Sequence, residues 1–360
     1  MASVEKRSDS QWRARWREYP GGPQRTKHFG RKVDADRHLV KVQHDLMVGA
    51  YIDPKAAQVT LRPYIATHLV RQPWRPATVS LARNAPERHV LGFFGDRPLG
   101  SIRKADVQAF VTGLDLAPAT VKLVHQHLSG LLSAAAEDRL IVVNPAVGVR
   151  LPRAGAGEVV PPSAEMVRAL YEAAPGWFSV AVVLGAGLGL RQAEASGLTA
   201  DRVDWLAGRS VRVDRQWRSK TVEQTGFAPP KSESSIRTIP AAASVLAELA
   251  AAVERRDGFV LNRAGQPVGH HPFQHAWRQT VKRAGVERGL RFHALRHRFA
   301  SVLISGGCSV VAVQRAMGHS SAAITLNLYG HLMPSDTDRI RGSLEDLFGK
   351  SPGQTAVTAK

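Results

Sequence analysis

The stretch FHALRHRFASVL, residues 292–303, has the spacing of a helix that buries one face. Its apolar residues recur every three or four positions, the period of a helical stripe. They are Phe292, Leu295, Phe299, Val302 and Leu303. Beside the stripe the helix would carry His293, Arg296 and His297, with small Ala300 between them in projection. The pattern predicts a helix that holds a cation and an imidazole at the edge of a core.

Two motifs follow this helix. MGHSS (317–321) supplies His319 after a glycine, and ITLNLYGHL (324–332) places Tyr329 in an apolar run. Tyr329 by itself allows two interpretations, a core ring with a hydrogen-bonded hydroxyl or a nucleophile. Buried tyrosines are common and catalytic ones are rare, so in isolation the core interpretation is favoured. The choice between the two interpretations of Tyr329 therefore depends on the other motifs.

Two further motifs precede the helix. GAGLGLRQAEASGL (185–198) lacks the third glycine of a dinucleotide-binding loop and instead predicts a helix with Arg191 and Glu194 as neighbours. A surface ion pair is the alternative interpretation of these two residues. PPKSESSIRTIP (229–240) places Lys231 in a polar turn between strand-like runs, where an ordinary surface lysine is also expected.

Taken together, GLRQAE, the turn lysine, HALRH, MGH and YGH have the order and approximate spacing of the tyrosine recombinases, the phage integrase family. The chain resembles that family most strongly over residues 163–345. The sequence has Ala294 and Met317 where the family often has an acidic residue and leucine, and neither position is catalytic. The resemblance implies an active site made of Arg191, Lys231, His293, Arg296, His319 and Tyr329.

The resemblance also implies the chemistry. Tyr329 would attack the scissile phosphate and form a covalent 3′-phosphotyrosine, while Arg191 and Arg296 bind the non-bridging oxygens. We expect His293 to be the base, His319 to donate a hydrogen bond to the phosphate, and Lys231 to protonate the departing 5′-oxygen. No carboxylate cluster accompanies these residues, so neither a metal nor another cofactor is expected.

The pattern of residues 3–49 predicts a separate small unit of three short strands and a helix. QWRARWREY alternates Trp12, Ala14 and Trp16 with Arg13, Arg15 and Arg17, which places the two sets on opposite faces of a strand. Asp34 is expected to cap the helix, whose apolar stripe is Leu39, Val42 and Leu46. The arginine face is a candidate DNA contact, and a solvated charged face is the alternative.

These patterns predict a multidomain α+β protein. We expect a small three-stranded sheet plus helix at residues 1–55 as an arm-type DNA-binding domain, and an all-helical core-site-binding domain at 56–152. A mainly helical catalytic domain with a small antiparallel sheet would occupy 153–348, followed by a tail at 349–360. Within the catalytic domain, residues 335–348 have the spacing of an amphipathic helix.

Composition indicates a polyanionic partner. The net charge is +19 over 360 residues, and each expected domain carries more basic than acidic side chains. A single cysteine, Cys308, excludes an internal disulfide and is expected to be buried. No run is long and apolar enough for a membrane span and no signal core is evident, so a cytoplasmic location is expected.

The sequence thus favours a site-specific integrase that acts on double-stranded DNA attachment sites as a homotetramer. An excisionase and a DNA-bending protein are candidate partners. A chromosome-dimer resolvase or a type IB-like topoisomerase would share the chemistry, and the expected arm-binding domain argues for the integrase. A non-catalytic architectural DNA-binding protein is the hypothesis from a different class.

Overall fold

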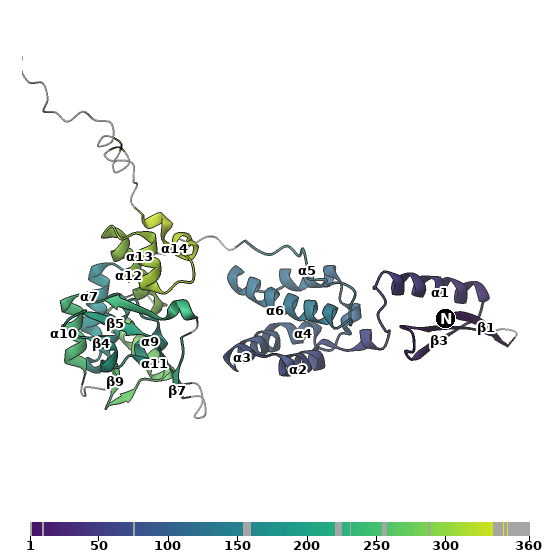
Figure 1. The fold of residues 1–360 in the computed structure, drawn as a ribbon, viewed down its shortest axis with the longest axis horizontal. Helices are drawn as coiled ribbons and strands as arrows, with labels where there is room; N and C mark the ends of the chain where they lie inside the picture. Colours follow the sequence, from purple (N-terminus) through teal and green to yellow (C-terminus); the bar gives the residue numbers. More distant parts are fainter. Residues whose placement is uncertain are drawn as a thin grey trace, which may run out of the picture. The chain divides into compact units, whose positions relative to one another are not determined.

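A computed structural model describes residues 2–8, 11–74, 76–153, 160–219, 225–230, 232–253, 258–286 and 289–333, together with 341 and 344. Figure 1 shows the course of the chain. The chain divides into two compact units, residues 1–156 and 157–360. The fold is mixed α+β, with several helices and small antiparallel sheets. No described helix has the length and apolar character that crossing a membrane requires.

The N-terminal part of the first unit is a three-stranded antiparallel sheet beside one helix. The strands are β1 (Ser3–Ser8), β2 (Gln11–Arg17) and β3 (Gln24–Phe29), in the order β1-β2-β3, and the helix is α1 (Lys32–Met47). Ala14 and Trp16 of β2 are buried with Leu39 and Val42 of α1, as the alternation predicts. The helix begins after Arg31, whose side chain donates to Asp34, so the prediction that Asp34 caps the helix is wrong.

The rest of the first unit is helical, as expected. It contains α2 (Leu61–Arg71), α3 (Pro76–Ala85), α4 (Leu91–Phe94), α5 (Lys104–Thr112) and α6 (Pro118–Glu137). Short helical turns η1 (Ala56–Gln58), η2 (Pro86–Val90) and η3 (Leu99–Ser101) connect them. The α6 residues Val124, Leu128 and Leu132 are buried in a core separate from that of the N-terminal sheet.

The second unit begins with helices α7 (Ala164–Ala173), α8 (Gly176–Ala186) and α9 (Gln192–Gly197), followed by the turn η4 (Ala200–Arg202). Next come strands β4 (Val203–Asp204), β5 (Ser210–Val213) and β8 (Arg237–Pro240), which form one antiparallel sheet in that order. Between β5 and β8 the chain forms a hairpin of β6 (Gln216–Arg218) and β7 (Gly226–Ala228), and then the turn η6 (Glu233–Ser235).

Helices dominate the remainder of this unit. They are α10 (Ala243–Ala252), α11 (His270–Arg283), α12 (His293–Ser305), α13 (Val310–Met317) and α14 (Ala322–Tyr329), followed by the turn η7 (Gly330–Leu332). A small hairpin of β9 (Asn262–Arg263) and β10 (Gln266–Pro267) precedes α11. The amphipathic helix expected at 335–348 lies outside the described residues apart from positions 341 and 344.

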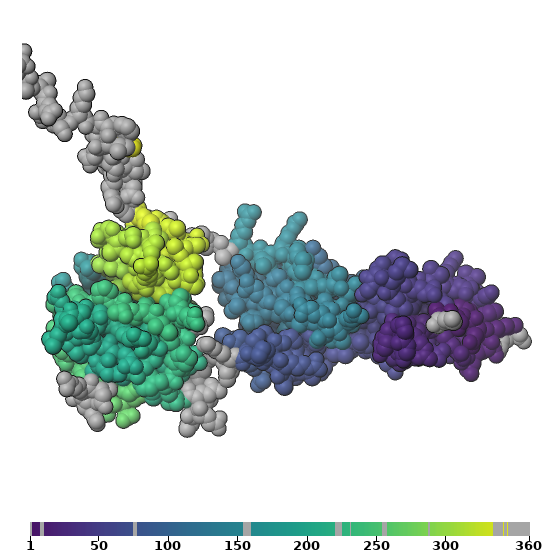
Figure 2. Space-filling view, in the orientation of Figure 1, coloured from purple at the N-terminus to yellow at the C-terminus, as the bar shows by residue number. Residues whose placement is uncertain are grey.

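One core runs through the second unit, and α12 lies in it. Leu295 of α12 is fully buried with Leu184 of α8 and Val211 of β5, and burial of a leucine or valine stabilises a fold by roughly 1.5–3 kcal/mol. In Figure 2 the segment from α12 to η7, in yellow-green and yellow, packs directly on the green remainder of this unit. The same core contains Val313 of α13 and Tyr329 of α14, so α12, α13 and α14 pack together with the sheet.

Two expectations about this unit are wrong. Val302 was expected to lie in the buried stripe of α12, but it is 48% exposed. Ile304 is buried in its place. Cys308 is exposed, because the turn through Gly306 and Gly307 carries the chain to the surface between α12 and α13.

Candidate active site

The C-terminal end of α13 is the centre of the candidate site. The helix stops at Gly318, whose φ of +62° is left-handed and favours glycine. A Cβ there would lie 3.0 Å from the Arg237 side chain and 3.1 Å from the Ser234 carbonyl, so close packing also favours glycine. The glycine of MGH therefore allows the chain to turn beside Arg237, and His319 follows at once.

Three arginines donate to three successive backbone carbonyls at this helix end. Arg237 Nε lies 2.9 Å from the Ala316 oxygen, Arg296 Nη2 donates to the Met317 oxygen, and Arg191 Nη2 lies 3.4 Å from the Gly318 oxygen. The last carbonyls of a helix have no partner within the helix and carry its negative dipole end. The arginines satisfy these carbonyls, and the carbonyls in turn fix the arginines.

Glu194 joins two of these arginines. Arg191 is the residue before α9, and its Nη1 lies 2.7 Å from Glu194 Oε1, while Arg237 Nη2 lies 2.9 Å from Glu194 Oε2. The glutamate side chain is only 4% exposed, so the alternative of a surface ion pair is wrong. Burial would raise the pKa of Glu194, but Arg237 and Arg191 outweigh it and lower that pKa to about 2.

Arg296 is the most buried of the three arginines, with an exposed fraction of 1%. Its Nη1 lies 2.5 Å from the oxygen of Gly189, a residue with a φ of +61°. A Cβ at Gly189 would lie 2.4 Å from the Phe299 ring, so glycine is required where this arginine is held. Burial and the charges of Arg191 and Arg237 lower the pKa of Arg296 to about 9, which leaves it charged at neutral pH.

His319 connects α13 to α14. Its Nδ1 lies 2.9 Å from the hydroxyl of Thr325, which is fully buried in α14. Burial, followed by the charge of Arg296, lowers the pKa of His319 to about 4. The ring is therefore neutral at pH 7. In the tautomer that accepts from Thr325 through Nδ1, it presents an Nε2–H donor.

Tyr329 ends α14 and is 1% exposed. Its hydroxyl lies 2.7 Å from Nδ1 of His297 in α12. Burial raises the pKa of Tyr329 to about 12, and the charge of Arg296 opposes this only in part. His293 lies one helical turn before His297, and the two ring centroids are 5.0 Å apart. Desolvation by the atoms packed around the His293 ring, followed by the charges of His297 and Arg296, lowers the pKa of His293 to about 4.

Of the six residues expected to be catalytic, the structure places Arg191, Arg296, His319 and Tyr329 in this linked cluster, with His293 beside His297. Lys231 lies outside the described residues. Arg237 and Thr325 were not expected in the cluster, and His297 was expected beside Arg296 but not among the catalytic residues. Arg237 leaves a signal in the sequence, because SIRTIP alternates and places it on the same strand face as the buried Ile239. A buried arginine needs an anionic partner.

The arginine face of the N-terminal sheet is partly neutralised. Arg13 and Arg15 both form ion pairs with Glu5, at 2.8 Å and 3.0 Å, and Arg17 donates to the Gly22 carbonyl. The Arg13 side chain is only 17% exposed. Arg17 is thus the most exposed of the three residues expected to contact DNA.

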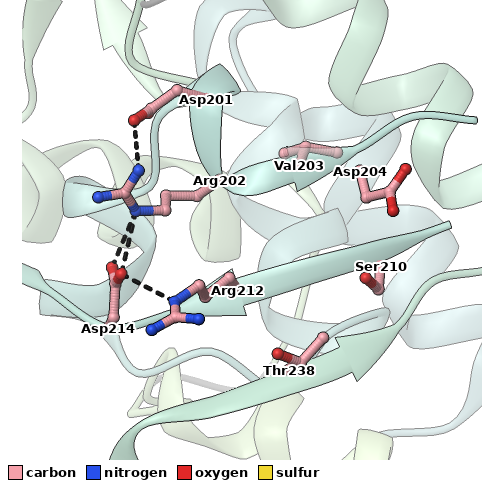
Figure 3. A pocket seen from close by; sticks show the side chains of 8 residues that line it. All are labelled: Asp201, Arg202, Val203, Asp204, Ser210, Arg212, Asp214 and Thr238. Carbon is pink, nitrogen blue, oxygen red and sulfur yellow. Dashed lines mark hydrogen bonds and ion pairs between the residues drawn. The ribbon is translucent and has the colours of Figure 1, made fainter. Parts of the chain in front are cut away.

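A hollow at the sheet β4-β5-β8, with a volume of about 570 Å³, is lined by charged side chains (Figure 3). These side chains satisfy one another, since Arg202 pairs with Asp201 and Asp214, and Arg212 pairs with Asp214. The residues described contain no group of three or more His, Cys, Asp or Glu side chains that could hold a metal ion.

Comparison with known proteins matches residues 164–335 to the phage integrase family. A tyrosine recombinase XerC-like protein of Caldanaerobacter subterraneus is 28% identical over 265 residues, which are 64% of this chain and 66% of that relative. The match thus spans slightly less than two thirds of the relative's length. A putative prophage phiRv2 integrase of Mycobacterium tuberculosis is 24% identical over 326 residues, 85% of this chain and 84% of that protein.

Solved structures show the same fold. The Tn1549 transposon integrase in complex with a circular intermediate DNA has a TM-score of 0.69 at 22% identity, over 80% of this chain and 99% of that chain. A lambda integrase tetramer bound to a Holliday junction has a TM-score of 0.59 at 16% identity, over 92% of this chain and 94% of that chain.

Proposed function

We propose that this chain, whose residues 164–335 match the phage integrase family, is a site-specific DNA recombinase of the tyrosine type. It cuts and rejoins DNA strands through a covalent 3′-phosphotyrosyl intermediate to integrate or excise a mobile element. The observation that carries the proposal is the cluster at the end of α13. A buried tyrosine there lies within the electrostatic reach of Arg296, which shares the helix end with Arg191.

The roles follow from the donors available. Arg191 and Arg296 bind the two non-bridging oxygens of the scissile phosphate, because a guanidinium presents paired N–H groups and keeps its charge at neutral pH. The neutral ring of His319 donates to the same phosphate through Nε2–H. Lys231 protonates the 5′-oxygen as it leaves. The energy of the broken phosphodiester is kept in the tyrosyl link, so rejoining needs no ATP.

Glu194 and Arg237 do not bind the phosphate in this proposal but hold Arg191, which does. The carboxylate binds both the Arg191 guanidinium and the Arg191 backbone N–H, which holds this arginine at the start of α9. Arg237 binds the other side of the carboxylate and the Ala316 carbonyl. Together they fix the position of Arg191 relative to α13.

The partners are double-stranded attachment-site DNA and further copies of this chain. A tetramer on DNA is supported by the fold shared with the lambda integrase tetramer bound to a Holliday junction. The small sheet with α1 supports an integrase rather than a resolvase, since it provides a unit for a second DNA site before the helical block. An excisionase and a DNA-bending protein complete the proposed assembly, which acts in the cytoplasm.

The test is covalent capture on a nicked suicide substrate built from the DNA that flanks the gene. The unmodified protein should form a denaturant-resistant adduct. Tyr329→Phe should form none while binding the DNA with unchanged affinity, because only the nucleophilic oxygen is removed. Tyr171→Phe is the matched control, since it also removes a hydroxyl that is hydrogen-bonded in the same unit, to Glu248 at 2.6 Å. A normal adduct yield from Tyr329→Phe would refute the assignment.

A further inference from the structure

The contact between Tyr329 and His297 has no role in the six-residue site. Tyr329 Oη and His297 Nδ1 are 2.7 Å apart, and the ring centroids are separated by 5.7 Å. The two residues come from different helices, α14 and α12, and are 32 positions apart. His297 follows Arg296 directly, so one turn of α12 carries both an arginine of the site and the ring that binds the tyrosine.

The surroundings of His297 favour its neutral form. His293 lies one turn away on the same helix, Arg296 is adjacent in the chain, and Tyr329 faces the ring from α14. Burial and the charge of Arg296 lower the pKa of His297 below its ordinary value of 6.5. In the tautomer with its proton on Nε2, Nδ1 has a free lone pair that accepts the tyrosine hydroxyl.

The tyrosine in turn needs a proton acceptor. Its pKa is about 12, so direct ionisation near pH 7 would leave only about one molecule in 10⁵ with a phenolate. His293 is the acceptor expected from the sequence, but its ring packs edge-on against the ring of His297, with the ring centroids 5.0 Å apart. His297, in contrast, is already within hydrogen-bond distance of the hydroxyl.

We propose that His297 is a catalytic residue and takes the hydroxyl proton of Tyr329 when the tyrosine attacks DNA. The inference rests on the proposed function. In cleavage, the O–H bond of Tyr329 breaks and its proton moves to His297 Nδ1. Oη forms a bond to phosphorus, the bond from phosphorus to the 5′-oxygen breaks, and Lys231 gives that oxygen a proton.

In rejoining, each transfer runs backward. The 5′-hydroxyl of the incoming strand loses its proton to Lys231 and attacks phosphorus, and the bond from phosphorus to Oη breaks. His297 returns its proton to Oη. Burial and the charge of neighbouring Arg296 disfavour the protonated ring, so His297 readily gives its proton back to Oη.

The test uses a substrate with sulfur at the bridging 5′ position. A thiolate leaves without protonation, so the cleavage rate reports on the nucleophile alone. With the full-length chain, His297→Ala should cleave this substrate roughly 10²–10⁴-fold more slowly than the unmodified protein. Added imidazole should restore part of the rate, because the smaller side chain leaves room for a free base. The unmodified protein in the same imidazole is the control.

The outcomes separate this proposal from the proposed function. If the unmodified protein forms no adduct, the proposed function fails. If it forms one and His297→Ala cleaves at the same rate, His297 is not the acceptor. Faster cleavage by His297→Ala would mean that the ring restrains the tyrosine, which also overturns the proposal. A slow variant that imidazole does not restore has lost structure, not a base, and counts against it.

A second measurement needs no variant. The single-turnover rate of the unmodified protein on the sulfur substrate should rise with pH and level off at or below about pH 6.5, because His297 is the base and its pKa is lowered. A rate that keeps rising about tenfold per pH unit through pH 9 would indicate direct ionisation of Tyr329 and would overturn the proposal.

Discussion

The ion pair between Glu194 and Arg237 should make a large contribution to the stability of the second unit. Both side chains are 4% exposed, and their closest N–O distance is 2.9 Å. A fall in the pKa of Glu194 from 4.5 to about 2 corresponds to roughly 3 kcal/mol of unfolding free energy at pH 7. Removing one partner leaves the other charge buried, which typically costs about 3–5 kcal/mol.

A double-mutant cycle measures this contribution. Glu194→Gln and Arg237→Gln should each lower the unfolding free energy by about 3 kcal/mol at pH 7, and the double variant should lose less than the sum by about 1–3 kcal/mol. Arg212→Gln is the matched control, since Arg212 lies on the neighbouring strand in an ion pair and is 61% exposed. It should change stability by no more than about 0.5 kcal/mol.

The assay is urea unfolding of the full chain, read by pulsed hydrogen exchange of peptides from α8 and α12. Glu194 has a lowered pKa, so its contribution is fully present above pH 4.5 and is lost as the pH falls toward 2. Glu194→Gln should lack this part of the acid sensitivity. The reasoning would be refuted if Glu194→Gln and Arg237→Gln lost no more unfolding free energy than Arg212→Gln, and if the coupling energy between the two positions were below about 0.5 kcal/mol.

Three further predictions concern the reaction. Lys231→Ala should cleave ordinary DNA roughly 10²–10⁴-fold more slowly yet cleave the 5′-sulfur substrate almost normally, whereas Arg296→Ala should stay slow on both. If Lys231→Ala cleaved the 5′-sulfur substrate as slowly as ordinary DNA, Lys231 would be excluded as the general acid. Adduct formation should survive excess EDTA, because arginines and not a metal ion bind the phosphate. A complete loss of adduct in EDTA that added Mg²⁺ restores would contradict this. Removing residues 1–55 should leave core-site nicking intact and abolish integration, and normal integration by the truncated chain would refute an arm function.

The sequence predicted elements with strong local patterns better than it predicted contacts. The period of residues 292–303 predicted α12, and the alternation of QWRARW predicted a strand with Trp16 inside. Boundaries were less accurate. Asp34 has a side chain that often caps helices, but the residue before α1 is Arg31, three positions earlier. Arg31 has the extended backbone angles of a cap residue, and the helix follows from Lys32.

The organisation of the site depended on tertiary contacts that no local pattern contains. Glu194 and Arg237 are 43 positions apart, and His297 and Tyr329 are 32 apart. Motif spacing could nominate Arg191 and Arg296, because the resemblance supplied their roles. It could not show that both arginines donate to the end of α13, since backbone carbonyls leave no mark in a sequence.

An anion that binds at the end of α13 should raise the unfolding free energy of the second unit. Three guanidinium groups and one carboxylate share this interior, so positive charge exceeds negative by two, and the helix dipole offsets only about half a charge. An anion that binds there binds the native state alone, and a ligand at 100 times its Kd adds about 2.7 kcal/mol to stability. The unit should therefore melt at a higher temperature in phosphate or sulfate than in chloride of equal ionic strength. On the proposed function, binding of the scissile DNA phosphate would also stabilise the folded unit, because it neutralises the excess positive charge at this helix end.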